Sequence, residues 1–264
     1  GHRVSASCPS PSPRPPVSAS PRPLFVAREQ ELARLQQWLG AALGGQGRVG
    51  FVVGEPGSGK TMLLREFAHR AMNAYPELVV AGGSCNAYAG LGDAYLPFAE
   101  ILRLLSGDVE AHRAAEAMSH EQAERLREAM PAALRAISQV GPAVIDTLLA
   151  RSALLARARA LPDGARWAAQ VQEAINRRPA VSSPLFLHDQ VTEVLRVVAE
   201  ERPLLLIVDD LQWADDASTS LLFHLARRLA GQRLLILGAY RPEEVAAERD
   251  GQPHPLAAVL GELQ

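Results

Sequence analysis

The segment Gly-Glu-Pro-Gly-Ser-Gly-Lys-Thr at residues 54–61 is the feature that most constrains the fold of this chain. An apolar run, Val49–Val53, precedes it, and residues with the apolar spacing of a helix follow it. The pattern G-x-x-x-x-G-K-[ST] between a strand and a helix is typical of a loop whose backbone N–H groups surround phosphate oxygens. A strand, a loop, a helix and a second strand in this order predict a parallel sheet with right-handed crossovers.

Each residue type in this loop has a chemical reason to bind phosphate. Glycines let the backbone adopt dihedral angles that other residues avoid, and they let it approach oxygen atoms closely. Lys60 is expected to reach the β and γ phosphates of a nucleotide, and Thr61 is expected to offer its hydroxyl to Mg²⁺. The expected nucleotide-binding residues are Gly54, Glu55, Pro56, Gly57, Ser58, Gly59, Lys60, Thr61 and Met62.

A pair of carboxylates follows the strongly apolar run Leu204–Val208. Such a run is typical of a buried parallel strand, and ligands bind beyond the carboxyl ends of these strands. We expect Asp209 to hold Mg²⁺ through water and Asp210 to orient or deprotonate an attacking water molecule. Taken alone, two aspartates at a strand end are better explained as the start of a turn, and the phosphate loop upstream is what favours the catalytic interpretation.

A cation closes another apolar run, because Arg241 follows the segment Leu234–Ala239. An arginine at a strand end close to a γ-phosphate can sense that group and stabilise transferred charge. Spacing alone is equally compatible with an ordinary arginine in a solvated turn. At this stage the two interpretations of Arg241, a γ-phosphate sensor and an arginine in a turn, are equally supported.

Apolar periodicity divides the rest of the chain into helices and strands. The stretch 106–180 is expected to form three or four helices, interrupted by prolines that include Pro131, and to be a helical insertion. A polar turn is expected at 241–244. The other expected helices are 28–43, 60–74, 187–200, 217–230 and 255–263, and the expected strands are 48–53, 78–81, 204–208 and 233–239.

Composition excludes several classes of function. The 264 residues are 48% apolar and carry a net charge of −2, so nothing indicates direct contact with nucleic acid or with a membrane. Cys8 and Cys85 are far apart, which suits a reducing, cytoplasmic compartment. Residues 1–23 hold seven prolines among Ser, Ala and Arg, and we expect a disordered tail or linker there, before a core at 24–264.

Four stretches together resemble the AAA-type ATPase module of STAND proteins, the signal-transduction ATPases with numerous domains. The version in large LuxR-type bacterial regulators is the most similar. The resemblance runs from about residue 25 to the end of the chain and is loose over 106–180. The four stretches are FVAREQEL at 25–32, GEPGSGKT at 54–61, PLLLIVDDLQWADDAS at 203–218 and LLILGAYRPEE at 234–244.

The resemblance implies a P-loop NTPase fold with three layers, α/β/α, and a parallel sheet of strand order 5-1-4-3-2. It implies that Val26 and Arg28 lie beside the adenine and ribose, and that Arg241 senses the γ-phosphate. Ala27 stands where the family usually has glycine. In the family a fifth strand, a helical lid and a winged-helix domain follow, so we expect a fragment that ends before them at Gln264.

Three functions remain open from the sequence. The leading one is a regulatory switch that binds ATP or ADP with Mg²⁺, hydrolyses ATP slowly through Asp210 and Arg241, and passes its state to the lid, winged-helix and sensor domains of a parent chain. Ligand-dependent self-association belongs to this hypothesis, and so does a variant in which the fragment binds nucleotide weakly. The alternatives are an AAA+ motor that assembles into rings and a small-molecule kinase whose lid arginines would be Arg151, Arg157, Arg159 and Arg166.

Overall fold

A computed structural model of the chain describes residues 28–86, 94–110, 118–177, 183–247 and 254–263. In these ranges one sheet has the strand order β1-β4-β3-β2, and every neighbouring pair is parallel. The predicted α/β fold is thereby confirmed, and the strands follow the 1-4-3-2 part of the predicted order. The strands are β1 (Arg48–Val53), β2 (Val79–Ser84), β3 (Leu204–Asp209) and β4 (Leu234–Tyr240).

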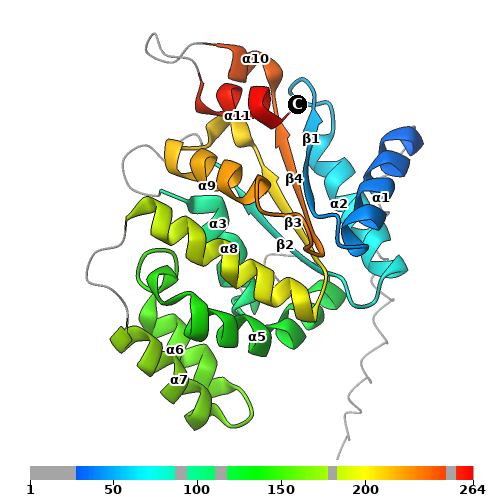
Figure 1. Ribbon diagram of the computed structural model, residues 1–264. Coiled ribbons are helices and arrows are strands. Elements are labelled where there is room, and N and C mark those ends of the chain that lie inside the picture. Colours follow the sequence, from blue (N-terminus) through cyan, green and yellow to red (C-terminus); the bar gives the residue numbers. More distant parts are fainter. Residues whose placement is uncertain (1–27, 87–93, 111–117, 178–182, 248–253, 264) are drawn as a thin grey trace, which may run out of the picture.

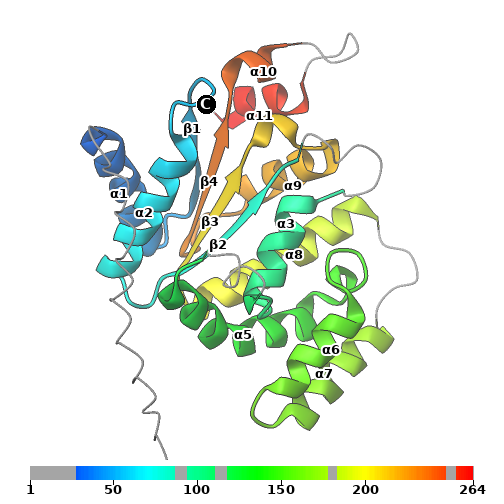
Figure 2. The same cartoon turned by 180° about the vertical axis from the view of Figure 1, so that it is seen from behind.

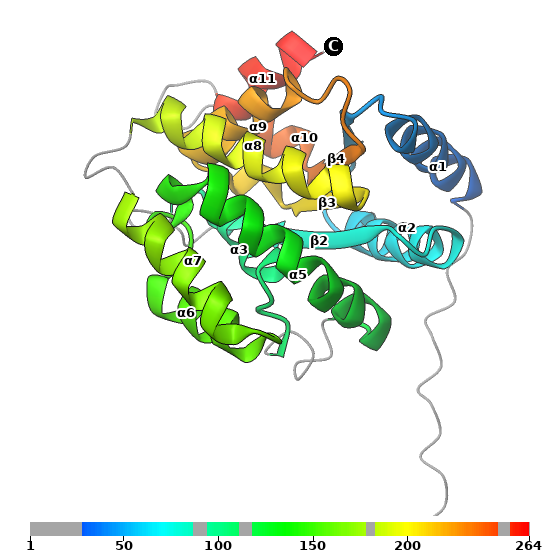
Figure 3. The same ribbon diagram turned by 60° about the horizontal axis from the view of Figure 1, so that its bottom comes forward.

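Helices cover both faces of this sheet, as Figures 1 and 3 show. The strands are apolar along their whole length because side chains alternate between two buried faces. Leu205 and Leu237 pack against α1 (Glu29–Leu43) and α2 (Lys60–Ala74), whereas Leu206 packs into the core on the other face. That second face is covered by α3 (Leu96–Leu105), α5 (His120–Val140), α8 (Pro184–Glu201) and α9 (Asp216–Ala226).

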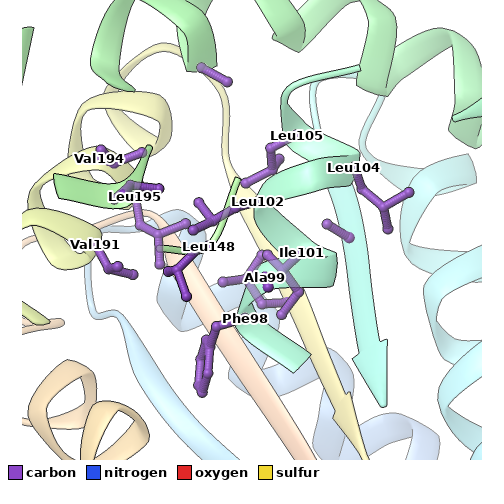
Figure 4. Close-up of a cluster of buried hydrophobic side chains, with 14 of the residues drawn as sticks. Phe98, Ala99, Ile101, Leu102, Leu104, Leu105, Leu148, Val191, Val194 and Leu195 are labelled. Carbon is purple, nitrogen blue, oxygen red and sulfur yellow. The ribbon is translucent and has the colours of Figure 1, made fainter. Parts of the chain in front are cut away.

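The helices between β2 and β3 share the main core with the sheet. In Figure 4, Phe98 and Leu102 of α3 lie beside Leu148 and the α8 side chains Val191 and Leu195. The helix α5 packs on both α8 and β2. Figure 2 shows two further helices on the outer side of α5 and away from the sheet. These are α6 (Arg151–Ala160) and α7 (Gly164–Arg177), which follow the short 3₁₀ helix η1 (Pro142–Val144).

Several boundaries differ from the sequence prediction, and three of the differences have a clear structural description. Pro131 does not interrupt a helix but lies inside α5, because buried neighbours such as Met130 and Leu134 hold the helix in the core across the missing N–H. The strand β2 continues through both glycines to Ser84. The helix α9 ends at Ala226 rather than at residue 230, although Leu229 beyond it is still buried.

The predicted polar turn after β4 is a short helix, α10 (Pro242–Ala246). Proline with its fixed φ angle is suited to the first position of a helix, and Arg241 occupies the preceding N-cap position. The last helix, α11 (Pro255–Leu263), agrees with its prediction and packs on α9 and α10. Figures 1 and 2 place α10 and α11 at the same end of the molecule as the loop that joins β1 to α2.

Several sequence predictions concern residues outside the described ranges, namely the tail at 1–23 with Cys8 and the residues Val26 and Ala27. Cys85 is buried and makes no disulfide. In the described part of the chain, no helix combines the length and the apolar character that crossing a membrane requires.

Candidate functional site

The phosphate-loop segment connects β1 to α2 at the carboxyl end of the sheet. Gly57 and Gly59 have φ angles of 74° and 80°, in the left-handed region that glycine adopts without strain. Gly59 is also the N-cap of α2, so the unpaired N–H groups of the first helical turn point out of the helix beside the loop. A helix N-terminus of this kind attracts anions through its N–H groups and its dipole.

The Lys60 side chain folds back onto this loop. Its Nζ donates to the carbonyl oxygens of Gly54 at 2.8 Å and of Glu55 at 3.0 Å. Only 8% of Lys60 is exposed, so the loop encloses its positive charge. The ammonium group is therefore fixed within the loop, where a bound phosphate would compete with two carbonyl oxygens for its three hydrogens.

Thr61 connects this loop to the end of β3. Its Oγ1 donates a hydrogen bond of 2.7 Å to Oδ2 of Asp209. Thr61 is on the first turn of α2 and Asp209 is the last residue of β3. The pair offers a hydroxyl and a carboxylate, the hard oxygen ligands that Mg²⁺ prefers together with water and phosphate.

The pairing of these two oxygens fits the predicted metal site. The Thr61 hydroxyl gives its hydrogen to Asp209 at 2.7 Å, so its oxygen lone pairs could bind Mg²⁺ while the Asp209 carboxylate would hold the ion through a water molecule. Among the described residues no group of three or more His, Cys, Asp or Glu could hold a metal alone, so most ligands would come from phosphate and water.

Asp210 has the unusual backbone conformation of the site, with a φ angle of 55°. Its N–H donates to Oδ1 of Asp209 at 2.9 Å, and its own Oδ1 accepts from Nε2 of Gln212 at 2.7 Å. The left-handed conformation turns the chain sharply at the end of β3, where the short helix η2 (Leu211–Trp213) begins. Aspartate tolerates this conformation better than most residues do.

Arg241 lies next to the two aspartates because β4 runs between β1 and β3. Its NH1 donates to Oε1 of Glu244 at 2.7 Å, and its NH2 is 4.0 Å from Oδ1 of Asp210. Asp210 and Arg241 keep 38% and 30% of their side chains exposed. The structure thus brings the two predicted catalytic side chains together at the carboxyl end of the sheet. It also pairs Arg241 with Glu244, which the sequence analysis did not single out.

The remaining predicted residues surround the loop. NH2 of Arg28 donates to the carbonyl oxygen of Ser58, which fixes the start of α1 against the loop. Glu55 and Pro56 are exposed, and Met62 is 40% exposed, so these side chains line the outer surface of the loop. Their arrangement is compatible with contact to a nucleotide.

Cys85 lies directly beneath this end of the sheet, since its N–H donates to the carbonyl oxygen of Asp209 at 3.0 Å. Burial raises the pKa of the Cys85 thiol, and the carboxylates of Asp215 and Asp210 raise it further. The thiol is therefore kept protonated. Asp215 also caps α9, because its Oδ1 accepts from the Ser218 N–H at 2.8 Å.

Sequence reasoning missed two buried polar residues beside the aspartates. Gln212 is 0% exposed and His254 is 1% exposed, and they are hydrogen-bonded to each other. Glutamine is mostly a surface residue, so a Gln in the loop after β3 gave no signal of its burial. The only available signal was its place two residues after Asp210.

Comparison with known families gives one result for this geometry. A protein-family model described as "AAA ATPase domain" matches residues 24–237, a range that holds the loop, Thr61 and both aspartates. No curated protein matches the chain. Nucleotide binding and ATPase chemistry are therefore indicated at family level. Because the match spans most of the sequence, the chain belongs to the AAA ATPase domain family.

Proposed function

We propose that this chain is the nucleotide-dependent switch of a larger signalling or transcription-regulatory protein, one that binds ATP with Mg²⁺ and hydrolyses it slowly. The observation that carries the proposal is the Thr61–Asp209 hydrogen bond of 2.7 Å. It joins the phosphate loop to the strand end that would hold the metal. A chain that used its glycine loop only as a turn would have no need for a carboxylate beside the loop hydroxyl.

The residues of the site take separate roles in this proposal. The N–H groups of the loop and Nζ of Lys60 bind the phosphates, while Arg28 holds the loop against α1 on the side proposed for the base and ribose. Bound Mg²⁺ would neutralise phosphate charge during transfer. Asp210 orients the attacking water, and Arg241 contacts the γ-phosphate and stabilises the charge that develops on it.

The pairing of these groups supports slow turnover. Lys60 is bonded to two loop carbonyls, and Arg241 is bonded to Glu244. Each cation has to exchange a protein partner for a phosphate oxygen before it can act, and such rearrangement makes a site less preorganised for the transition state. A site of this kind suits a switch that holds its nucleotide for a long time.

The assignment to the STAND type rests on the motif set. The FVAREQEL, phosphate-loop, DDLQWAD and AYRPEE segments occur in the family's order. We propose a cytoplasmic protein in which residues 1–23 are a linker, residues 24–264 are the ATPase core and 106–180 are a helical insertion in it. A lid, a winged-helix domain and a sensor domain would be the partners of this core, with self-association when nucleotide is bound.

Two other functions receive less support. A kinase would need its lid arginines close to the phosphates, yet Arg151 is paired with Asp146, and Arg157 with Asp108 at 2.8 Å. Figures 1 and 2 place the helices α6 and α7, which carry these arginines, at the end of the molecule opposite the loop. A ring-forming motor would need an arginine from a neighbouring subunit, and its ATPase rate per chain would rise with protein concentration.

The test compares binding and hydrolysis of ATP in matched variants. Lys60→Ala should abolish Mg²⁺-dependent ATP binding, measured by equilibrium dialysis with labelled ATP. Arg65→Ala is the control, because it removes one positive charge from an exposed position of the same helix α2. The switch proposal fails if Lys60→Ala binds ATP as tightly as the unchanged protein, and rapid turnover that grows with protein concentration would favour a motor.

A further inference from the structure

Gln212 makes contacts to three parts of the site although it is completely buried. Its side-chain Nε2 donates to Oδ1 of Asp210 at 2.7 Å, and its Oε1 accepts from the Arg241 N–H at 3.2 Å. Its backbone oxygen accepts from Nε2 of His254 at 2.9 Å. One residue thus connects the Asp210 side chain and the Arg241 backbone to the segment that precedes α11.

The hydrogen bonds of His254 define its tautomer. The Leu256 N–H donates to Nδ1 of His254 at 3.1 Å, so Nδ1 must carry a lone pair. Nε2 then carries the hydrogen and donates to the carbonyl oxygen of Gln212. His254 is 1% exposed and Leu256 is 0% exposed, so water does not compete for these bonds.

These bonds fix where α11 begins relative to Asp210 and Arg241. His254 directly precedes Pro255, the first residue of α11, and Leu256 is buried in the main core. Because α11 packs on α9 and α10, it joins the helix that follows the aspartates to the helix that follows Arg241. A shift of α11 would therefore pull on Gln212 through His254.

We propose that Gln212 is a positioning residue that holds Asp210 away from Arg241, and that His254 couples this arrangement to α11. The proposal rests on the proposed function in that Asp210 and Arg241 are its catalytic pair. The Asp210 oxygen that Gln212 binds is the one that lies 4.0 Å from Arg241. Without the amide hydrogen, that oxygen is attracted onto the guanidinium, and the two side chains neutralise each other instead of acting on water and phosphate.

The first experiment replaces Gln212 with a residue of similar volume. Gln212→Met keeps the backbone oxygen that His254 uses and removes the side-chain bonds to Asp210 and to the Arg241 N–H. Misplacement of a catalytic group commonly lowers a rate by about 10- to 100-fold. We expect kcat for ATP hydrolysis to fall by this amount and the Kd for ATP to change much less, because the phosphate loop and Lys60 keep their phosphate contacts while only Asp210 and Arg241 are misplaced.

Gln232→Met is the matched control. Gln232 is another buried glutamine, 8% exposed, whose Nε2 donates to the Arg228 carbonyl oxygen at 2.7 Å. This variant should lose comparable stability in thermal unfolding and keep its kcat. If both variants lower kcat equally, or if Gln212→Met retains kcat within about twofold, the positioning role of Gln212 is refuted.

The second experiment tests the coupling through His254. His254→Leu removes the donor to the Gln212 carbonyl oxygen and should lower kcat, whereas His254→Gln provides a side-chain N–H at a similar distance and should restore most of it. Equal activities of these two variants would show that His254 acts by packing alone and would overturn the coupling.

Hydrogen exchange separates this proposal from the proposed function. The Arg241 amide should exchange faster in Gln212→Met than in Gln232→Met, and the Leu256 amide should exchange faster in His254→Leu than in His254→Gln. If the unchanged protein neither binds nor hydrolyses ATP, the proposed function fails, and the exchange rates alone then decide on the hydrogen-bond network. Unchanged exchange at both amides would overturn the network whatever the activity.

Discussion

The hydroxyl of Thr61 donates a hydrogen bond of 2.7 Å to Oδ2 of Asp209, a residue 148 positions further along the chain. The bond connects the first turn of α2 to the end of β3. Both side chains lie at the surface rather than in the core, and exposed pairs of this kind add little to folding stability. Their proximity supports the proposed role of both oxygens in holding Mg²⁺.

Thr61→Val should separate metal binding from folding. Valine has nearly the shape of threonine but lacks the hydroxyl, so Mg²⁺-dependent ATP hydrolysis should fall by about 100-fold or more. Thr61→Ser keeps the hydroxyl and should retain most of the activity. The measurement is ATPase rate against Mg²⁺ concentration, with EDTA as the zero point. Equal rates for the Val and Ser variants would contradict a role for this hydroxyl in holding the metal.

Arg125 should be among the residues that contribute most to stability. It is 9% exposed, and its guanidinium donates to the carbonyl oxygens of Met72 at 2.8 Å, Tyr75 at 2.8 Å and Leu78 at 3.2 Å. These carbonyls lie at the end of α2 and before β2, so the side chain ties α5 to that connection.

Arg125→Met should lower the free energy of unfolding by about 3 kcal/mol, because it leaves buried carbonyl oxygens without their charged donor. Arg135→Met is the control on the same helix, since Arg135 pairs with Glu201 and both side chains are 42% exposed. The loss of that exposed pair should cost less than about 1 kcal/mol. Urea denaturation measures both values, and similar losses for the two variants would contradict the role of the buried bonds.

The nature and order of the main elements could be predicted because each has a local cause. Glycines at defined spacing force the loop after β1, and the apolar run 204–208 can only be a buried strand in such a sheet. The sheet order, however, came from a family resemblance rather than from local pattern. Nothing in the periodicity of β4 says that it lies between β1 and β3.

The contacts of the site were harder to predict, because they depend on residues far apart in sequence. Glu244 pairs with Arg241 since a proline starts a helix where a turn was expected. Gln212 and His254 meet only because the segment before α11 lies against η2, and neither residue type marks itself as buried. Pro131 was misread for the same reason, since packing on both sides of α5 outweighed its local preference.

Two adjacent glycines in β2 should differ sharply in their tolerance of a methyl group. A Cβ atom on Gly83 would lie 2.1 Å from the backbone oxygen of Pro97, whereas the nearest atom to a Cβ on Gly82 is 3.7 Å away. Gly83→Ala must push α3 off the sheet and should cost about 1–3 kcal/mol or more. Gly82→Ala should be nearly neutral. Thermal unfolding of both variants tests this, and equal melting temperatures would contradict the close approach of α3.

A pair of buried histidines should make stability fall at mildly acidic pH. His188 accepts or donates a 3.1 Å hydrogen bond with the Tyr95 hydroxyl, and the His224 ring packs against it while Asp189 and Arg228 contact His224. Burial lowers the pKa of both imidazoles; the neighbouring ring lowers that of His188 further, and Arg228 lowers that of His224. Asp189 opposes both shifts.

The sign of the effect follows from proton binding. A lowered pKa means that the unfolded chain binds protons that the folded chain does not, so stability declines as pH falls below the unfolded value of about 6.5 and toward the folded pKa. Denaturant unfolding between neutral and mildly acidic pH should show this slope. His188→Gln should make the slope shallower, whereas the exposed His120, replaced in the same way, should leave it unchanged. A slope that is identical in all three proteins would contradict the burial of these rings.

The Cys85 thiol should be nearly inert in the folded protein. It is 6% exposed, and burial together with nearby carboxylates raises its pKa. The thiolate is the reactive form, so alkylation requires an opening of the structure as well as deprotonation.

In a Cys8→Ser background, iodoacetamide should label the native protein at least about 100-fold more slowly than the unfolded chain, and the native rate should keep rising with pH beyond the range where a free thiol levels off. Adding denaturant below the unfolding midpoint should speed the reaction in proportion to the opening of this region. Labelling of the native protein at the rate of the unfolded chain would contradict this burial, and would mean that Cys85, next to Asp209, is open to solvent.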